Sequence, residues 1–186
     1  LERVLAFDMG GTTAKLALVD DGEPLVAYGF EAAREKRFLR GSGLPIMIAT
    51  VELIEIGAGG GSIARVDKLQ RITVGPDSAG SPPGPVCYGR GGVEPAVTDA
   101  NLALGKIDPT YFAGGKIKLD EAGAKAALQK NIGDKLGLKD FWPAAGVTEI
   151  VEENMANAAR VHAIERGRDI AQCTMIAFGG GAPLHA

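Results

Sequence analysis

A glycine turn followed by hydroxyl residues comes after the first apolar run, and it constrains the fold more than any other stretch. Residues 4–7 lead directly into Asp8-Met9-Gly10-Gly11-Thr12-Thr13. Adjacent glycines allow a tight turn in which no Cβ obstructs a phosphate, and the backbone amides can point at the anion. Asp8 would stand at the carboxyl end of a buried strand, where ligands gather in α/β sheets. The stretch therefore predicts a phosphate site, although an ordinary β-hairpin turn has the same composition.

Two further predicted strands run into adjacent glycines, at Ile56-Gly57-Ala58-Gly59-Gly60 and at Phe178-Gly179-Gly180-Gly181. Three such turns indicate several backbone-lined anion sites, or close approaches of the chain to a flat ligand. A P-loop is excluded, because the sequence has no Gly-x-x-x-x-Gly-Lys-Ser/Thr. Residues 59–64 fit a dinucleotide fingerprint, but the charged segment and Pro-rich loop after them do not continue as a βαβ unit.

Length and composition exclude several classes of function. At 186 residues the chain can form one ordinary domain with long loops. Its 20 Lys and Arg against 23 Asp and Glu give a net charge of -3, which offers no basic surface for nucleic acid or an acidic membrane. Cys87 and Cys173 lack the spacing of a zinc site or a disulfide framework. Without an apolar run of about 20 residues or a signal pattern, we expect a cytoplasmic protein with no nucleic-acid or membrane partner.

Strands are predicted through the first half of the chain, at residues 3–8, 14–19, 25–30, 46–56 and 71–74. The segment 75–95 then contains too much Gly and Pro for regular structure. On composition alone this long loop favours disorder or a linker. Tyr88 and Arg90 are its candidate contact residues.

Helices are predicted afterwards, beginning with a short one at 98–104. Asp120 is the expected N-cap of a second helix with one apolar stripe made of Ala124, Leu128, Ile132 and Leu136. The longest helix is expected at 147–166, ended by Gly167. Its apolar side would be Ile150, Val151, Met155, Ala158, Val161 and Ile164, and its solvated flank Glu153, Asn154, Asn157 and Arg160. With a closing strand at 174–178, the fold class is α/β, with helices packed on a mixed sheet.

An ordered set of motifs along nearly the whole chain resembles the hydantoinase A/5-oxoprolinase family. The motifs are 7–13, 56–64, Gly75-Pro76-Asp77-Ser78-Ala79-Gly80, 85–92, Val97-Thr98-Asp99-Ala100-Asn101-Leu102, Glu153-Asn154-Met155-Ala156-Asn157-Ala158 and 177–180. Each is moderately specific, and their order makes the set specific. The family includes ATP-dependent N-methylhydantoinases and 5-oxoprolinases, which open cyclic amides, and acetone and acetophenone carboxylases.

The resemblance implies an actin-like ATPase fold, in which two ribonuclease-H-like halves close over ATP. This chain would be the second half, with a family-specific insertion at about 31–119 and a helical part and closing strand at 120–186. The first half and its phosphate motif would precede Leu1, because the chain looks like a piece of a longer protein. A second subunit of the hydantoinase B type is also implied. The 186-residue piece alone is expected to lack ATPase activity.

The expected nucleotide contacts follow from the turn and the resemblance. Asp8 would organise Mg²⁺, or Mn²⁺, directly or through water. The amides of Gly10 and Gly11 and the hydroxyls of Thr12 and Thr13 would hold phosphate oxygens, and Gly179, Gly180 and Gly181 would lie in the adenosine motif. Lys15 would add a cation if the strand points it toward the phosphates, or would remain a solvated lysine.

The sequence departs from the family at two places. Thr13-Ala14-Lys15 stands where Ser-Thr-Asp is frequent, and Gly-Gly-Gly-Ala-Pro replaces the commoner Gly-Gly-Ala-Gly-Pro. These departures leave the substrate open between a hydantoin, 5-oxoproline and a ketone. Asp99 and Asn101 could cap a helix or take part in catalysis, and His162 and His185 are expected to be structural or incidental.

Two other functions remain possible from the residues. A non-enzymatic module that changes shape on binding ATP would share every phosphate contact with the enzyme. A dehydrogenase would instead bind NAD through Gly59. No catalytic nucleophile is identifiable, because two histidines and two distant cysteines make no recognisable triad.

Overall fold

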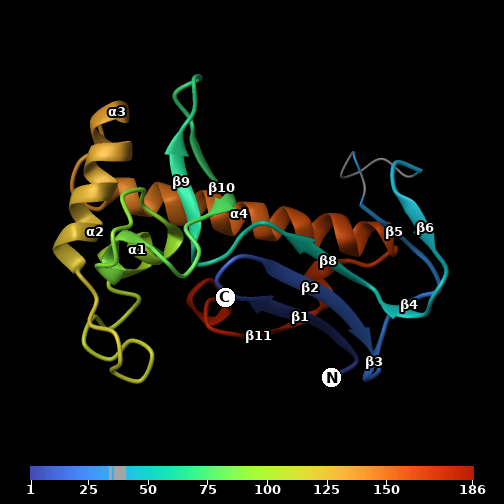
Figure 1. Cartoon of the computed structure of the whole chain (residues 1–186). Helices are drawn as coiled ribbons and strands as arrows, with labels where there is room; N and C mark the ends of the chain where they lie inside the picture. The colour runs from blue at the N-terminus through green and yellow to red at the C-terminus, as the bar shows by residue number, and fades with distance from the viewer. Residues whose placement is uncertain (34, 36–40) are drawn as a thin grey trace.

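A mixed sheet around β1 (Arg3–Met9) positions the predicted phosphate turn. The computed structural model describes residues 1–33, 35 and 41–186, and the others, inside the predicted insertion at 31–119, lie outside the described residues. β1 pairs antiparallel with β2 (Ala14–Asp20) and parallel with β11 (Thr174–Phe178), while β2 also pairs with β3 (Glu23–Pro24) and β8 (Leu53–Ile56). Figure 1 shows helix α4 (Trp142–Glu165) running behind this sheet. The α/β class with a mixed sheet is confirmed.

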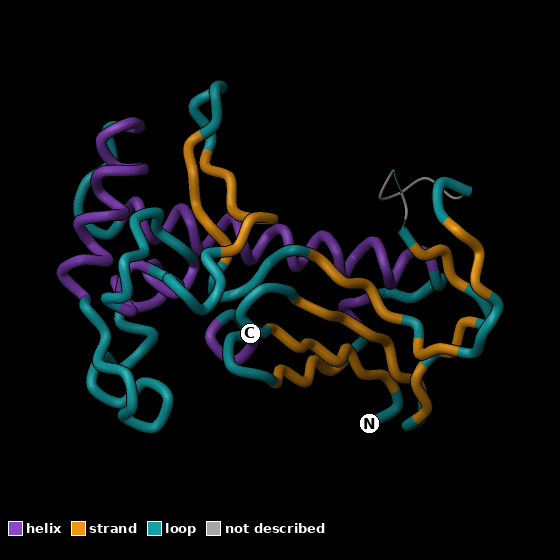
Figure 2. The backbone as a smooth tube through the Cα atoms, viewed as in Figure 1, coloured by secondary structure: helices purple, strands orange, loops and turns teal. Residues whose placement is uncertain are grey.

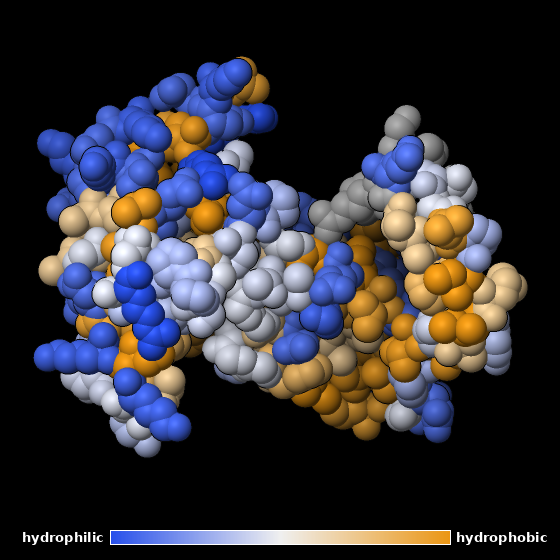
Figure 3. Space-filling view, in the orientation of Figure 1, coloured by the Kyte–Doolittle hydropathy of each residue, from blue (hydrophilic) through white to orange (hydrophobic). Residues whose placement is uncertain are grey.

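Alternation along β1 and β2 gives the sheet an inner and an outer face. Leu5, Phe7 and Met9 on β1 are buried, as are Leu16 and Leu18 on β2, and they share one core with the buried side of α4. The residues between them point to the opposite face because successive side chains alternate in a strand. This outer face is open in the space-filling view, where apolar side chains gather over the sheet (Figure 3).

Helix α4 begins earlier than predicted, and its predicted apolar stripe is confirmed only in part, at Val151, Met155 and Ala158. Pro143 in the first turn is compatible with a helix start, because its missing N–H is not needed there. Val147, Val151 and Met155 are buried as the core of the stripe. The expectation for Val161 and Ile164 was wrong, since they are 40% and 72% exposed. At 100° per residue they lie about 80° and 140° around the helix from Val151.

The shorter helices follow the sequence pattern closely. α1 covers Val97–Ala103 and α2 covers Glu121–Leu128, which continues through a π-helical turn at Gln129–Gly133 into α3 (Asp134–Leu136). The Asp120 side chain accepts from the Gly123 amide at 2.9 Å, so the predicted N-cap is confirmed. The predicted stripe is also confirmed, because Ala124, Leu128 and Ile132 are buried and Leu136 packs against the core.

Several strands differ from their predictions. The single strands expected at 25–30 and 46–56 are broken into β4 (Val26–Ala27), β5 (Phe30–Ala32), β6 (Leu44–Ile46), β7 (Thr50–Val51) and β8. β4 pairs only with β7, and β5 only with β6, within the described ranges (Figure 2). Side chains in this part, such as Tyr28 and Met47, are exposed at 75% and 79%, so no core holds the strands continuous.

β10 (Ile72–Ser78) confirms the strand expected at 71–74 and extends it, and it forms a hairpin with β9 (Ser62–Val66), a strand that was not predicted. Asp67 closes its turn by accepting from the amides of Leu69 and Arg71 at 2.8 and 2.9 Å. The Gly/Pro-rich loop that follows is packed rather than disordered. A 3₁₀ turn at Val86–Tyr88 buries Cys87 completely.

Asp99 explains why this loop is held. Its carboxylate is fully buried and accepts from the backbone amides of Val86, Cys87 and Ala96 at 3.1, 2.7 and 2.8 Å. One buried side chain therefore fixes both the loop and the start of α1.

None of the helices in the described ranges combines the length and apolar character that a membrane crossing requires.

Candidate functional site

Three glycine turns meet at one edge of the main sheet. β1 and β11 are parallel, and β8 has the same direction because β1 and β8 both pair antiparallel with β2. The carboxyl ends of all three strands therefore share an edge (Figure 1). Backbone bonds join the turns there: Gly60 and Gly61 donate to the carbonyls of Gly10 and Gly11 at 3.0 and 2.7 Å, and Gly181 donates to Met9 at 2.9 Å.

The glycines at this edge serve two purposes. A Cβ on Gly59 would lie 2.6 Å from the Thr12 backbone, and one on Gly179 would overlap Asp8 Oδ1. Gly179 also has a φ of +85°, in the left-handed region that favours glycine. These two glycines allow the segments to pack. A Cβ on Gly11 or Gly180 would meet no atom within 4 Å in the described structure, so these two face open space that a ligand can enter.

The amides of the first turn are only partly available to an anion. The Gly10 amide donates to the Thr13 carbonyl at 3.0 Å and closes the turn, so it is not free to hold phosphate as expected. The Gly11 and Thr12 amides have no hydrogen-bond acceptor among the described residues, and both residues are exposed. The turn therefore presents two adjacent N–H groups to solvent.

Asp8 and Lys15 lie side by side on the outer face of the sheet. They are directly paired across β1 and β2, and Lys15 is in turn paired with Glu55 on β8. Lys15 Nζ donates to Thr13 Oγ1 at 2.8 Å and lies 3.2 Å from Glu55 Oε1. Hydrogen bonds from Thr13 and Lys15 hold the pKa of Glu55 below its ordinary value. The predicted residues of the first turn thus lie together at one edge of the sheet, and the Lys15 ammonium group is already paired with Glu55.

A divalent cation would have few protein ligands here. Within the described residues no group of three or more His, Cys, Asp or Glu side chains is placed to hold an ion. Mg²⁺ in nucleotide sites commonly binds one or two carboxylates together with phosphate oxygens and water. Asp8 beside the open turn fits that arrangement, with the phosphate supplying the remaining oxygens.

A cavity of about 570 Å³ opens beside the glycine turns. We call it the glycine-turn cavity. Its lining includes Gly10, Gly11, Gly180 and Gly181 of the turns, together with Tyr88, two residues of α1, and residues 106, 107, 112 and 113. Thr98 and Asn101 reach it from α1, because residues three apart share a helix face. Figure 3 shows the molecule indented between the segment around residues 106–113 and the sheet.

A chain of polar contacts adjoins this cavity. Asn101 Nδ2 lies 3.0 Å from His185 Nε2, and His185 Nδ1 lies 3.0 Å from Glu152 Oε1. Lys106 Nζ donates to the same Glu152 oxygen at 3.1 Å and to the Leu184 carbonyl at 3.0 Å. His185 is thus not incidental. The sequence carried no signal for this chain of contacts, because its members come from distant segments.

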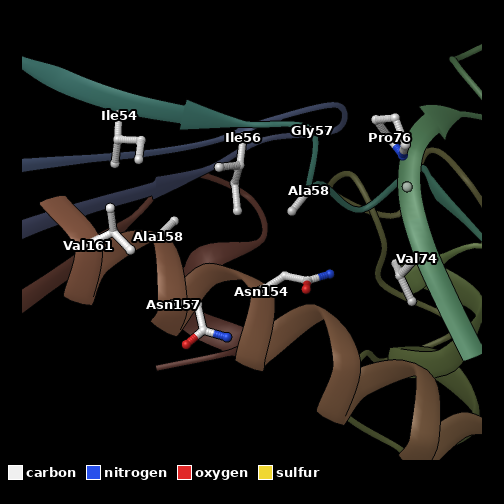
Figure 4. Close-up of a pocket in the computed structure, with 11 residues that line it drawn as sticks. Ile54, Ile56, Gly57, Ala58, Val74, Pro76, Asn154, Asn157, Ala158 and Val161 are labelled. Atoms are coloured by element: carbon white, nitrogen blue, oxygen red, sulfur yellow. The ribbon is translucent and has the colours of Figure 1, made fainter. Parts of the chain in front are cut away.

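A second groove, of about 300 Å³, lies between β8, β10 and α4. Figure 4 shows Ile54, Ile56 and Ala58 on one side and Asn154, Ala158 and Val161 on the helix. Asn154 and Asn157, expected on a solvated flank, are exposed as predicted but border this groove. Arg160 donates to Glu153 Oε1 at 2.8 Å and to Asn157 Oδ1 at 2.9 Å.

Comparison with known proteins identifies the family to which the chain is similar. The family model described as Hydantoinase/oxoprolinase matches residues 1–186. The acetophenone carboxylase gamma subunit of Aromatoleum aromaticum is 40% identical over 99% of this chain and 24% of its own length. The caprolactamase subunit alpha of Pseudomonas jessenii is 39% identical over the whole chain and 25% of its own length.

Solved structures show the same likeness. A nucleotide-free structure of acetone carboxylase superposes with a TM-score of 0.84 at 30% identity, covering 100% of this chain and 25% of that one. The crystal structure of the ATP-dependent caprolactamase from Pseudomonas jessenii gives 0.83 at 39% identity, covering 100% and 26%. The chain spans about a quarter of the length of the relatives it matches. It belongs to the hydantoinase/oxoprolinase family.

Proposed function

We propose that this chain is part of an enzyme that uses ATP to open the ring of a cyclic amide. The observation that carries the proposal is the meeting of three glycine turns beside Asp8, where two amides of the first turn face solvent. Family membership supports it, since one relative is an ATP-dependent caprolactamase. A nucleotide's phosphates suit such an edge, because free N–H groups and one carboxylate are what a phosphate–metal pair needs.

Ring opening through ATP makes chemical sense. The carbonyl carbon of a lactam is a poor electrophile, so direct attack by water is slow. Transfer of the γ-phosphoryl group from ATP to the amide oxygen releases ADP and creates a leaving group. Water can then add to the activated carbon, and the adduct collapses by breaking the ring C–N bond, with a proton passing to the nitrogen. This leaves an acyl phosphate, which a second water hydrolyses to the carboxylate and phosphate. The protein's part is to position the reactants and neutralise charge.

Each predicted contact has a place in this proposal. The amides of Gly11 and Thr12 and the hydroxyls of Thr12 and Thr13 would bind phosphate oxygens, and Gly10 would keep the turn closed. Asp8 would hold Mg²⁺ or Mn²⁺, which would neutralise phosphate charge. The Lys15 ammonium group would leave Glu55 and contact a phosphate oxygen instead. Residues 179–181 would contact the nucleoside, with Gly180 leaving the space open.

The proposal extends to the fold and partners. We propose that the chain is one ribonuclease-H-like half of an actin-like ATPase, with an insertion at about 31–119, and that a first half of the same chain completes the cleft. Support comes from the uncovered outer face, where Leu53, Ile176 and Phe178 are 45%, 46% and 48% exposed. A second subunit of the hydantoinase B type and a cytoplasmic location belong to the same proposal. The 186-residue piece alone would be inactive.

A second candidate is an ATP-dependent ketone carboxylase. The observation in its favour is the 40% identity to an acetophenone carboxylase subunit, which is about the same as the 39% identity to the caprolactamase subunit. Both reactions activate a carbonyl oxygen with ATP, so the glycine turns serve either. The two differ in the second substrate, which is water for ring opening and bicarbonate for carboxylation.

The experiment is substrate-dependent ATP turnover by the full-length protein with its partner subunit. ADP release would be measured with ε-caprolactam, 5-oxoproline and hydantoin, and separately with acetophenone plus bicarbonate. We expect stimulation by a cyclic amide, and its loss in Asp8→Asn without loss of folding. Stimulation only by ketone and bicarbonate would select the carboxylase. ATP binding without stimulated turnover would indicate a non-enzymatic switch instead.

A further inference from the structure

The glycine-turn cavity has a single charged side chain in its lining, that of Lys106. The other lining residues within the described structure are glycines, apolar residues and uncharged polar residues. Tyr88 is one of them, and burial raises the pKa of its hydroxyl above the ordinary value, so it is uncharged at neutral pH. The charge that a ligand meets in this cavity therefore depends on the surroundings of Lys106.

The charge of Lys106 is already balanced by the protein. Its Nζ donates to Glu152 Oε1 at 3.1 Å and to the Leu184 carbonyl at 3.0 Å. His185 Nδ1 lies 3.0 Å from the same Glu152 oxygen, and burial lowers the pKa of that histidine, so it adds no positive charge at neutral pH. One ammonium group and one carboxylate leave this wall of the cavity without net charge.

Arg90 is a second cation near Tyr88, but it does not line the cavity. Its guanidinium carbon lies 6.0 Å from the centroid of the Tyr88 ring, at the distance of a cation–π contact. The residue is exposed to solvent. A carboxylate inside the cavity would therefore not meet this guanidinium directly.

The rest of the wall suits an uncharged ring. Tyr88 and Phe112 both line the cavity, with ring centroids 5.6 Å apart, and Ile107 adds aliphatic surface. Small-molecule sites are mostly lined by such apolar and aromatic side chains, with a few polar groups that set orientation. Ring CH₂ groups gain free energy when they leave water for a wall of this kind.

We propose that the glycine-turn cavity binds an uncharged cyclic amide and disfavours one that carries a carboxylate. The inference rests on the proposed function, which places phosphates on the amides of Gly11 and Thr12. Those amides would then be taken, and the phosphates would repel a second anion. A carboxylate would lose water without gaining a free cation, which makes its binding costly. The cavity would thus favour rings such as ε-caprolactam or hydantoin over 5-oxoproline.

A matched pair of lactams tests the proposal in the full-length protein with its partner subunit. 5-Oxoprolinamide has the ring of 5-oxoproline and replaces its carboxylate with an uncharged carboxamide of nearly the same size. The kcat/KM of each lactam would be measured as lactam-dependent release of ADP. We expect the wild type to favour 5-oxoprolinamide by at least about tenfold, because a carboxylate lacks a free cation in the cavity.

Glu152→Gln should shift that preference toward the anion. Glutamine keeps an oxygen that accepts from Lys106 and His185 but removes the negative charge, so the ammonium group is no longer balanced. The ratio of the two kcat/KM values should fall at least about threefold, mainly through a gain for 5-oxoproline. If this variant does not fold, as judged by its thermal transition, Lys106→Gln tests the same balance, because it should raise the ratio instead.

Two control variants change charge elsewhere. Glu153→Gln removes a carboxylate from the next residue of α4, where it pairs with Arg160 and does not line the cavity. Arg90→Gln removes the exposed guanidinium beside Tyr88. Both should keep the wild-type ratio to within about twofold, because solvent and salt screen exposed charges.

The outcomes separate this inference from the proposed function. A wild type that favours 5-oxoproline, or a ratio that a folded Glu152→Gln leaves unchanged, would overturn the inference while ATP-dependent lactam turnover stands. A ratio that falls in Glu153→Gln as far as in Glu152→Gln would overturn it as well. A protein whose ATP turnover responds to no cyclic amide would refute the proposed function and this inference with it.

Discussion

At the scale of single residues, the edge of the sheet depends on where a Cβ can be tolerated. Gly179 lies against Asp8 and has a left-handed backbone, whereas Gly180 next to it faces open space. Neighbouring glycines therefore have different reasons to be glycine. The sequence shows both as members of one motif, and only the packed structure distinguishes the glycine that permits a close approach from the one that leaves room.

Gly179→Ala should destabilise the protein and displace Asp8. A left-handed backbone costs a non-glycine residue about 1–3 kcal/mol, and the added methyl group would overlap the Asp8 carboxylate. Gly180→Ala is the matched control and should change stability by less than about 0.5 kcal/mol. Urea denaturation of both variants measures this, and equal stability of the two would contradict the prediction.

The reactivity of the Cys87 thiol tests whether Asp99 holds the Gly/Pro-rich loop of residues 75–95 in place. Burial, and then the nearby Asp99 carboxylate, raise the pKa of the Cys87 thiol, so it should not react with a thiol reagent in the native state. Asp99→Asn replaces an acceptor of three amides with a side chain that accepts at one atom only, which should cost about 1.5–3 kcal/mol. Labelling of Cys87 should then accelerate. Cys173, which is partly exposed, serves as the internal reference.

At the scale of elements, the predicted buried face of α2 was confirmed, whereas that of α4 was correct only in part. Asp120 and the stripe through Ala124 and Leu128 followed from local spacing, which is why they were confirmed. In α4 the apolar residues are spread around the helix, so the sequence alone does not show which of them meet the sheet. The prediction of continuous strands at 25–30 and 46–56 was wrong for a related reason. The β-branched residues between 23 and 51 do not pack into a hydrophobic core, so only short strands form there.

Matched valines in α4 test the observed face. Val147 is fully buried and Val161 is 40% exposed. Val147→Ala should cost about 1–3 kcal/mol through lost burial and the cavity it leaves. Val161→Ala should cost less than about 0.5 kcal/mol. Equal losses in a denaturant titration would mean that α4 is rotated relative to the sheet.

At the scale of the whole molecule, two neighbouring rows of side chains on the outer face of the sheet differ in character. Ile176, Ala6, Ala17 and Leu53 are paired in one row across four strands, and Phe178, Asp8, Lys15 and Glu55 form the next. An apolar row beside a charged one suits a surface that other protein covers while a ligand binds at its edge. The sequence predicted the strands and glycine turns that carry the second row, but register decides which residues become neighbours.

Stability of the whole chain should fall as pH drops below neutrality. Burial lowers the pKa values of His162 and His185, so the unfolded chain binds protons more readily than the folded one. Their stabilising contribution is complete above the ordinary histidine pKa of about 6.5 and is lost as pH falls through and below it. Urea denaturation at about pH 7.5 and pH 5.5 should show this loss, and His162→Phe should reduce it. A pH-independent unfolding free energy would contradict the prediction.

The shared edge of β1, β8 and β11 has a consequence for synthesis. Its first glycine turn is made among the earliest residues of the chain, yet Gly181 must reach back to Met9 before the edge is complete. If the proposed phosphate site is correct, it is complete only after residue 181 has been made and has folded back onto β1. A nascent chain that ends before this residue would then carry the first turn without its neighbours.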